Sequence, residues 1–477
     1  HIVRRVIGQA LGIPWGNVRV IKPYIGGGFG NKQDVLYEPL NAFLTTQVGG
    51  RPVKLDVSRE ETFCNTRTRH SIEFDLAAGV GKDGRLLAKD MHSYSNQGAY
   101  ASHGHAIAAN GLTSWRLQYA CPNIRGEAYT IYTNTPVGGA MRGYGIPQVC
   151  FAIESFMDDV ANEIHMDPLE FRRKNLIQGY YEDAYLKPIA ANTNGIFECL
   201  EKGAEYIHWD EKRKEYAEQA GDVRKGVGMA LFSYKTGVWP ISLEIAGARL
   251  SLNQDGSVQL MLGATEIGQG ADTVFSQMVA ETLHTDMEHV HIKTVQDTDV
   301  SPFDTGAYAS RQSFVTGTAV RHCAEILRDK ILAYAKTLLP EIDTRELTLK
   351  DNWIWAGDEQ AISLAALAEE SYYSLTNSSV LTAEVSEQVK KNTIATGCCF
   401  AEVEVDIKLG KIKILHIINV HDSGKLLNPQ LAEMQVHGGM SMGMGYGISE
   451  QLILDEKTGR PLNGNLLDYK LMTMLDT

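Results

Sequence analysis

The chain has 477 residues, which exceeds the usual size of one hydrophobic core, so we expect at least two domains. Hydrophobic residues make up 44% of the chain and charged residues 22%, which is typical of a folded globular protein and argues against disorder. The formal net charge of −13 argues against a nucleic-acid partner, because phosphate recognition needs a basic surface. No apolar run has the length of a membrane span.

The first residue and the cysteines indicate the context of the chain. His1 opens a run that reads as the interior of an ordered segment, so we expect the native N-terminus, and any targeting signal with it, to be missing. The seven cysteines are irregularly spaced and include no Cys-x-x-Cys pair, which argues against a disulfide framework, an iron–sulfur cluster or a zinc ribbon. We therefore expect buried, reduced thiols in a cytoplasmic protein.

Apolar residues recur at helical spacing in three segments and alternate at strand spacing in three hairpins, and Gly49-Gly50 would stop a further helix that begins near Asp34. The return strand of each hairpin leads into a polar, glycine-containing segment. This repetition suggests related α+β units that deliver loops to a common site, with ordinary hairpins of a mixed sheet as the alternative. A domain boundary is expected near 180–195. In chain order, the expected elements are a helix from about Asp34 to Gly49-Gly50, a hairpin over 72–98, a helix over 147–164, a hairpin over 248–270, helices over 271–284 and 317–339, and a hairpin over 403–424.

Five motifs contain residues suited to chemistry, although an ordinary turn also explains each one alone. A glycine loop follows the strand-like run 18–22 and would let backbone amides approach an anion, but its spacing fits neither a P-loop nor the dinucleotide fingerprint. Arg142 suits an oxyanion, and Gln269 offers a heterocycle both a donor and an acceptor. Amides at the start of the 317–339 helix suit an anion. The motifs lie at 26–32, 138–145, 263–270, 309–313 and 435–439.

In their order and combination, the five motifs resemble the molybdenum-binding subunit of the xanthine dehydrogenase family, the molybdo-flavoprotein hydroxylases. The resemblance extends from the first helix to Asp468-Tyr-Lys470 and is greatest to the bacterial subunit type. It implies an α+β fold with two molybdenum-cofactor-binding domains, built of mixed sheets with packed helices and holding the cofactor between them. The expected domains are residues 1–185 and 186–477, each with its outer part missing.

The resemblance also assigns roles to the motif residues. Phe29, Arg142 and Ala309 would lie near the molybdenum, which the dithiolene sulfurs of the pterin hold. Gly268, Gln269 and Gln435 would contact the pterin, and the segment 310–313 would bind phosphate, although the family usually shows Ser-Val-Ser where this chain has Ser-Arg-Gln-Ser. The implied cofactor-binding residues are Gly28, Phe29, Gly30, Arg142, Gly268, Gln269, Ala309, Ser310, Arg311, Gln312, Ser313 and Gln435. We expect these motifs to converge on one cleft.

Three positions would contact the substrate, and all three depart from purine-oxidising members of the family. Gln33 replaces a glutamate, Asn110 aligns near an arginine, and Tyr144 replaces a stacking phenylalanine. Gly143 stands where carbon monoxide dehydrogenases carry a cysteine, which argues against that activity.

The catalytic glutamate of the family would lie beyond Thr477, so we expect no catalytic residue in these 477 residues and no hydroxylation by them alone. If a base were sought inside the chain, the candidates are Glu266, Asp422 and His421.

The implied function is hydroxylation of a purine-like N-heterocycle, xanthine or hypoxanthine, with water as the oxygen source. The alternatives are an aldehyde oxidoreductase of the same family and an inactive, cofactor-holding fragment. The implied cofactor is molybdenum–molybdopterin, with its cytosine dinucleotide form as a variant. FAD and 2Fe-2S clusters would reside on partner subunits or fused domains, and the assembly is expected to be a dimer.

Overall fold

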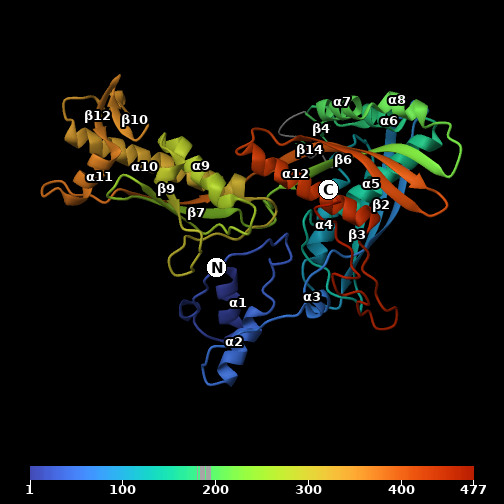
Figure 1. The fold of residues 1–477 in the computed structure, drawn as a ribbon, viewed down its shortest axis with the longest axis horizontal. Helices are drawn as coiled ribbons and strands as arrows, with labels where there is room; N and C mark the ends of the chain where they lie inside the picture. The colour runs from blue at the N-terminus through green and yellow to red at the C-terminus, as the bar shows by residue number, and fades with distance from the viewer. Residues whose placement is uncertain (180, 183–187, 190–194, 477) are drawn as a thin grey trace. The chain divides into compact units, whose positions relative to one another are not determined.

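The computed structural model describes residues 1–179, 181–182, 188–189 and 195–476, and these form two compact units (Figure 1). The units alternate along the chain and are not consecutive halves, so the division at 185/186 stays a prediction about family domains. The boundary segment expected near 180–195 lies largely outside the described residues. Unit 1 comprises His1–Gly28, Lys32–Leu55 and Thr236–Asn392, and unit 2 comprises Phe29–Asn31, Asp56–Lys235 and the chain from Thr393 onward.

Unit 1 is built on a four-stranded sheet in the order β13-β7-β8-β9, in which only the β8–β9 pair is parallel. Helix α10 packs on β7 and β13, and α9 packs on β9 and α10. A small antiparallel sheet, β10-β11-β12, also contacts α10. The elements are α1 Ile2–Leu11, α2 Glu38–Gln47, β7 Ile245–Leu252, β8 Val258–Leu262, α9 Ala271–Leu283, β9 Val290–Ile292, α10 Gly317–Leu338, β10 Leu347–Lys350, β11 Trp353–Ala356, β12 Glu359–Ser363, α11 Leu364–Tyr373 and β13 Thr382–Gln388, with single 3-10 turns at Trp15–Asn17, Met287–His289 and Thr344–Glu346 and a π-helical turn at Gln312–Thr316.

Unit 2 contains two three-stranded sheets, ordered β1-β2-β3 and β15-β14-β6, and the first of them mixes antiparallel and parallel pairs. Helices α5 and α6 pack together, and α7 covers β14 and β15. The elements are α3 Arg59–Asn65, β1 Ile72–Val80, β2 Leu86–Gly98, α4 Gly104–Ser114, β3 Ile124–Tyr132, α5 Ile146–Glu163, α6 Pro168–Asn175, β4 Tyr181–Glu182, β5 Pro188–Ile189, α7 Ile196–Ile207, α8 Trp209–Glu215, β6 Val223–Thr236, β14 Thr393–Asp406, β15 Lys411–Asp422 and α12 Pro429–Ile448.

The mixed helix and strand content confirms the α+β prediction, and the amphipathic helices form where they were expected. In α5, Val149, Ile153 and Met157 are buried on one face, and Pro147 lies in the first turn. Helices α9 and α10 match the predicted 271–284 and 317–339, and the three predicted hairpins are β1–β2, β7–β8 and β14–β15.

Two local predictions need correction. The helix expected from Asp34 begins at Glu38, because Pro39 is tolerated only in a first turn; it ends before Gly49 and Gly50, which have φ angles of 69° and 80°. The strand-like run 18–22 forms only an isolated bridge, between Ile21 and Asp297.

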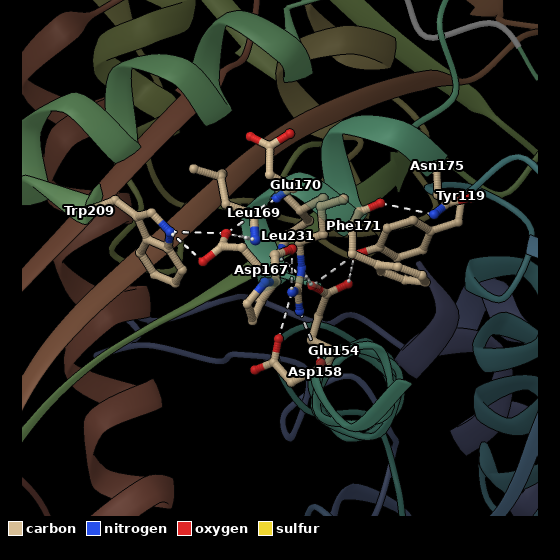
Figure 2. A network of polar contacts seen from close by, with 12 residues as sticks. Tyr119, Glu154, Asp158, Asp167, Leu169, Glu170, Phe171, Asn175, Trp209 and Leu231 are labelled. Atoms are coloured by element: carbon tan, nitrogen blue, oxygen red, sulfur yellow. Dashed lines mark hydrogen bonds and ion pairs between the residues drawn. The ribbon is translucent and has the colours of Figure 1, made fainter. Parts of the chain in front are cut away.

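A buried ion-pair network fixes α5, α6 and β6 within unit 2 (Figure 2). The fully buried Arg172 donates to Glu154 Oε2 at 2.9 Å and to Asp158 Oδ1 at 2.6 Å. The Tyr119 hydroxyl donates to Glu154 Oε1 at 2.8 Å, and the backbone N–H of Leu231 donates to Glu154 Oε2 at 2.9 Å. Both buried charges of this network, on Arg172 and Glu154, therefore have a partner of opposite sign, which the low internal dielectric requires.

Candidate functional site

The glycine loop at 26–32 makes one set of contacts within unit 1. The backbone N–H of Gly27 donates to the carbonyl oxygen of Ile267 at 2.8 Å. A Cβ atom at Gly28 would lie 3.2 Å from Ile267 Cδ1, and one at Gly268 would lie 3.6 Å from the Gly27 nitrogen. The backbones of the 26–32 and 263–270 motifs thus approach each other where glycine leaves room.

Within unit 2, the same loop meets the 138–145 motif. Gly30 has a φ of 99°, and a Cβ atom there would lie 2.9 Å from the carbonyl carbon of Ala140. Phe29 has a left-handed φ of 52°, which only a few per cent of non-glycine residues adopt, and its side chain is half exposed. Such backbone strain persists where the surroundings hold it, and it is frequent at functional sites.

Two glutamines from separate motifs pair in unit 1. Gln269 Nε2 donates to Gln312 Oε1 at 2.6 Å and to the carbonyl oxygen of Thr265 at 3.1 Å. Gln269 Oε1 accepts from the Ile267 N–H at 2.7 Å, and Gln312 Nε2 donates to the same Thr265 carbonyl at 3.1 Å. The two side chains therefore fix the 263–270 loop against the start of the segment that leads into α10.

Glu266 supports this loop and is not placed as a general base. Its carboxylate accepts backbone N–H bonds from Gly268 at 2.6 Å, Gly270 at 3.2 Å and Asp272 at 3.0 Å. Burial works to raise the pKa of Glu266, but these backbone hydrogen bonds outweigh it and hold the pKa below its usual value. A carboxylate stabilised in its charged form is a weak proton acceptor.

The 309–313 segment has an unusual backbone. Ala309 and Ser310 have left-handed φ angles of 47° and 52°, whereas Arg311 is right-handed, and a π-helical turn follows at Gln312–Thr316. The Gly237 N–H donates to the Ala309 carbonyl at 2.9 Å. A left-handed residue followed by a right-handed one directs successive N–H groups to one side, which is a geometry that binds anions.

The Arg311 guanidinium is held by ion pairs and hydrogen bonds within the protein, and the cofactor contact expected of Arg311 stays a prediction. It is fully buried, with Nε 2.6 Å from Glu244 Oε2 and Nη1 2.8 Å from Asp304 Oδ1. It also donates to the carbonyl oxygens of Gly306 and Ile245 at 3.1 and 2.7 Å. Arg311 thereby fixes the 309–313 segment to the buried Glu244 and Asp304.

Arg142 and Gln435 come together in unit 2. Arg142 Nη2 donates to the Gln435 carbonyl at 2.6 Å and to its Oε1 at 3.2 Å. Cβ atoms at Gly438 and Gly439 would lie 3.1 and 3.8 Å from the guanidinium nitrogens, so these glycines make room for the arginine beside α12. Burial lowers the pKa of Arg142.

Arg69 belongs to this group but was not predicted. Its Nη2 donates to the carbonyl of Arg142, its Nη1 donates to Gln148 Oε1 at 3.1 Å, and its guanidinium lies 5.1 Å from the centre of the Tyr446 ring on α12. Arg69 and Arg142 together hold the 138–145 loop against α12. Arg69 stands outside any glycine-rich motif, so its sequence surroundings do not indicate this role.

Two of the three predicted substrate residues are in contact. Asn110 Nδ2 donates to the carbonyl of Tyr144 at 2.9 Å, and both residues are half-buried in unit 2. His103, which was not predicted, lies 2.7 Å from the Tyr144 hydroxyl through Nδ1. Gln33 is half-buried in a turn of unit 1.

The motif residues thus form one group in each unit. Convergence of the two groups on one cleft stays a prediction. Of the other candidate bases, His421 packs on Phe232 with ring centroids 4.9 Å apart, and burial lowers its pKa. The Asp422 carboxylate accepts from the Gly424 N–H at 3.2 Å. Neither neighbourhood distinguishes a base.

Three further observations concern the described ranges. No group of three or more His, Cys, Asp or Glu side chains there is arranged to hold a metal ion. None of the helices in those ranges combines the length and apolar character that a membrane span requires. All seven cysteines, which lie in the described part, are free thiols.

Comparison with known proteins gives consistent matches along the chain. Residues 1–176 and 202–477 each match a family model described as a molybdopterin cofactor-binding domain. The whole chain is 49% identical to the putative xanthine dehydrogenase molybdenum-binding subunit of Escherichia coli K12 and covers 63% of it. Over 98% of its length, the chain is 32% identical to the probable hypoxanthine oxidase of the same organism and covers 49% of it.

A solved structure supports the same fold. Quinoline 2-oxidoreductase from Pseudomonas putida 86 matches 100% of this chain and 63% of its own, with a TM-score of 0.90 and 24% identity. The chain spans less than two thirds of the length of each of these proteins.

Proposed function

Because the chain belongs to the xanthine dehydrogenase family of molybdopterin-binding proteins, we propose that it is the cofactor-binding part of a hydroxylase that oxidises a purine-like N-heterocycle with water as the oxygen source. The observation that carries this proposal is the pairing of motif residues that are remote in sequence. Gln269 pairs with Gln312, and Arg142 pairs with Gln435, 293 positions away. Hydrogen bonds between the side chains of different motifs are not expected for a set of unrelated turns.

The residues fit a pterin with an anionic group. An amide oxygen accepts two hydrogen bonds, so Gln269 Oε1 and Gln312 Oε1 each retain one acceptor position after their protein contacts. Gln435 is held through its oxygen by Arg142 and offers its amide N–H groups to a ring. The left-to-right-handed step at Ser310 and Arg311, followed by the helical segment from Gln312, suits a phosphate.

When bound, the molybdenum–pterin group would supply the two-electron oxidation of the substrate carbon. In the proposal, the chain itself binds and orients. Gly28, Phe29, Gly30 and Gly268 keep the backbone close to the cofactor, and Ala309 and Arg142 place peptide groups beside the metal. Ser310 to Ser313 hold the phosphate-bearing end, in either the simple or the cytosine dinucleotide form.

The substrate class rests on the relatives and on the turn at 143–145. The names of the two matched Escherichia coli proteins refer to xanthine and hypoxanthine. Tyr144 presents an aromatic ring of the kind that stacks on a flat heterocycle. Gly143 has a φ of 93°, and a Cβ atom there would lie 2.6 Å from Pro147 Cδ, so this turn does not accommodate the cysteine expected for carbon monoxide oxidation.

We also propose electron-transfer partners and a cellular location for the protein. Electrons would leave through 2Fe-2S clusters and FAD on partner subunits or fused domains, in a cytoplasmic assembly that is a dimer. The proposed partners and location rest on family membership. The alternative substrate class is an aldehyde.

The test is analysis of the native, full-length protein purified from its source. We expect stoichiometric molybdenum and pterin, copurifying iron and flavin, and dye reduction with xanthine or hypoxanthine. Protein without pterin would contradict the cofactor assignment. Protein with pterin that oxidises acetaldehyde but neither purine would favour the aldehyde alternative.

A further inference from the structure

One face of helix α4 packs on the turn that contains Tyr144. His103, Ile107 and Asn110 follow one another at intervals of four and three residues, which places them on one side of a helix. A Cβ atom at Gly145 would lie 2.7 Å from Ile107 Cγ2, so the helix and the turn are in close contact at the centre of this face. His103 and Asn110 bind Tyr144 on either side of that contact.

Tyr144 is fixed at both of its ends. Asn110 Nδ2 donates to the backbone carbonyl at 2.9 Å, and His103 Nδ1 lies 2.7 Å from the phenol oxygen. The backbone has a left-handed φ of 49° between Gly143 at 93° and Gly145 at 91°. Three successive residues with positive φ define a sharp turn, and a tyrosine adopts this conformation only where its neighbours hold it.

His103 constrains the orientation of the ring as well as the position of the hydroxyl. A hydrogen bond at the phenol oxygen fixes the direction of the ring axis. The imidazole and phenol rings also meet edge to face, with centroids 5.7 Å apart and planes at 79°, which restricts rotation about that axis. A phenylalanine at this position would lack the first of these constraints.

We propose that His103 is a specificity-determining positioning residue, which holds the Tyr144 ring ready to stack on a flat heterocyclic substrate. The inference rests on the proposed function, because it assumes that Tyr144 contacts the substrate. A ring that is already oriented loses less rotamer freedom on binding, and this advantage applies to a planar ring but not to a small acyclic aldehyde.

The experiment compares variants of the complete holoenzyme on two substrates, xanthine and acetaldehyde, and measures the Kd of urate, the product of xanthine hydroxylation, by calorimetry. The variants are His103→Ala, His103→Asn and Tyr144→Phe. Asn retains a hydrogen-bonding atom near the position of Nδ1. His105→Ala, at an exposed position two residues further along the chain, and Tyr100→Phe, at an exposed tyrosine, are the controls.

We expect His103→Ala to lower kcat/KM for xanthine by about threefold to tenfold, mainly through KM, and to weaken urate binding by the same factor. Acetaldehyde turnover and molybdenum content should remain at the control level. His103→Asn should restore most of the loss, and adding Tyr144→Phe to His103→Ala should cost little more, because both remove one interaction.

Equal effects of His103→Ala and His105→Ala would overturn the inference. So would a matching loss of xanthine and acetaldehyde turnover, or a loss of molybdenum, because either would mean a general structural role. A wild-type holoenzyme that contains pterin but oxidises no purine would overturn the proposed substrate class, and this inference with it.

Discussion

Arg142 donates from one guanidinium nitrogen to both the backbone carbonyl and the side-chain oxygen of Gln435, at 2.6 and 3.2 Å. One residue comes from a loop before α5 and the other from the second turn of α12, so the pair links segments that are remote in sequence. Arg69 strengthens the same link by binding the Arg142 carbonyl and by stacking over Tyr446. Substitution of either arginine should therefore first destabilise the 138–145 loop.

We expect Arg142→Met to weaken cofactor retention by about tenfold to a hundredfold, because a charge-assisted hydrogen bond contributes about 1.5–3 kcal/mol. The measurement is pterin fluorescence of the holoprotein after extended dialysis. Arg460→Met, at an exposed position of the same unit, is the control. Equal pterin retention by the two variants would show that the Arg142–Gln435 contact does not support the site.

The glutamine pair of unit 1 gives a second prediction. Gln312→Leu would leave an N–H of the half-buried Gln269 without its partner, at a cost of about 1 kcal/mol, and so should loosen the 263–270 loop. We expect faster backbone hydrogen exchange in that loop and lower pterin content. Gln254→Leu, in the exposed turn between β7 and β8, is the matched variant; the idea fails if it loosens the loop as much.

Arg172 and Arg173 allow a comparison of adjacent arginines in different surroundings. Arg172→Met should lower the free energy of unfolding by about 3–5 kcal/mol, because it leaves the buried Glu154 carboxylate without its cation. Arg173 pairs with Glu170 and Glu201 at the surface, so Arg173→Met should cost at most about 1 kcal/mol. Urea denaturation measures the free energy of unfolding of both variants. Similar midpoints would contradict the expectation that Arg172→Met is the more destabilising substitution.

His70 should make stability depend on pH. It lies buried beneath the 138–145 loop, and a Cβ atom at Gly138 would be 2.7 Å from its Nδ1. Burial, with a smaller effect of the Arg69 charge, lowers its pKa from 6.5 to about 4. In the interval between these values the unfolded chain binds more protons, so this stabilisation is complete above the unfolded pKa and is lost as pH falls toward the folded one.

By linkage, His70 alone should cost about 2 kcal/mol of unfolding free energy between pH 7 and pH 5. Urea titrations at the two pH values should show a smaller drop for His70→Gln than for the wild type. His105→Gln, at an exposed position, should keep the wild-type drop. Identical drops in all three proteins would mean that His70 is protonated without penalty.

The sequence predicted the elements that bury one apolar face, and the structure confirms them. Helices α5, α9 and α10 lie within a residue or two of their expected bounds, because periodic burial is encoded locally. The π-helical turn at Gln312–Thr316 and the parallel β2–β3 pair depend on partners elsewhere in the chain, so local patterns did not indicate them.

Among the site residues too, features encoded locally could be predicted, and features that depend on distant partners could not. The glycine-rich loops are recognisable in the sequence, because a positive φ angle or a close backbone approach favours glycine. Arg69 and His103 act through a single distant partner each, and their neighbours carry no comparable pattern. The cofactor contact of Arg311 stays a prediction, and its motif did not indicate that Glu244 and Asp304 pair with its guanidinium.

The sheet order β15-β14-β6 has a consequence for synthesis on the ribosome. Strand β6 ends at Thr236, and its partner β14 begins at Thr393, so most of unit 1 is made between them. Until β14 emerges, β6 has an unpaired edge, the kind of surface through which nascent chains associate wrongly. Biogenesis of this protein should therefore depend on a chaperone that shields β6 while the intervening part of unit 1 is made.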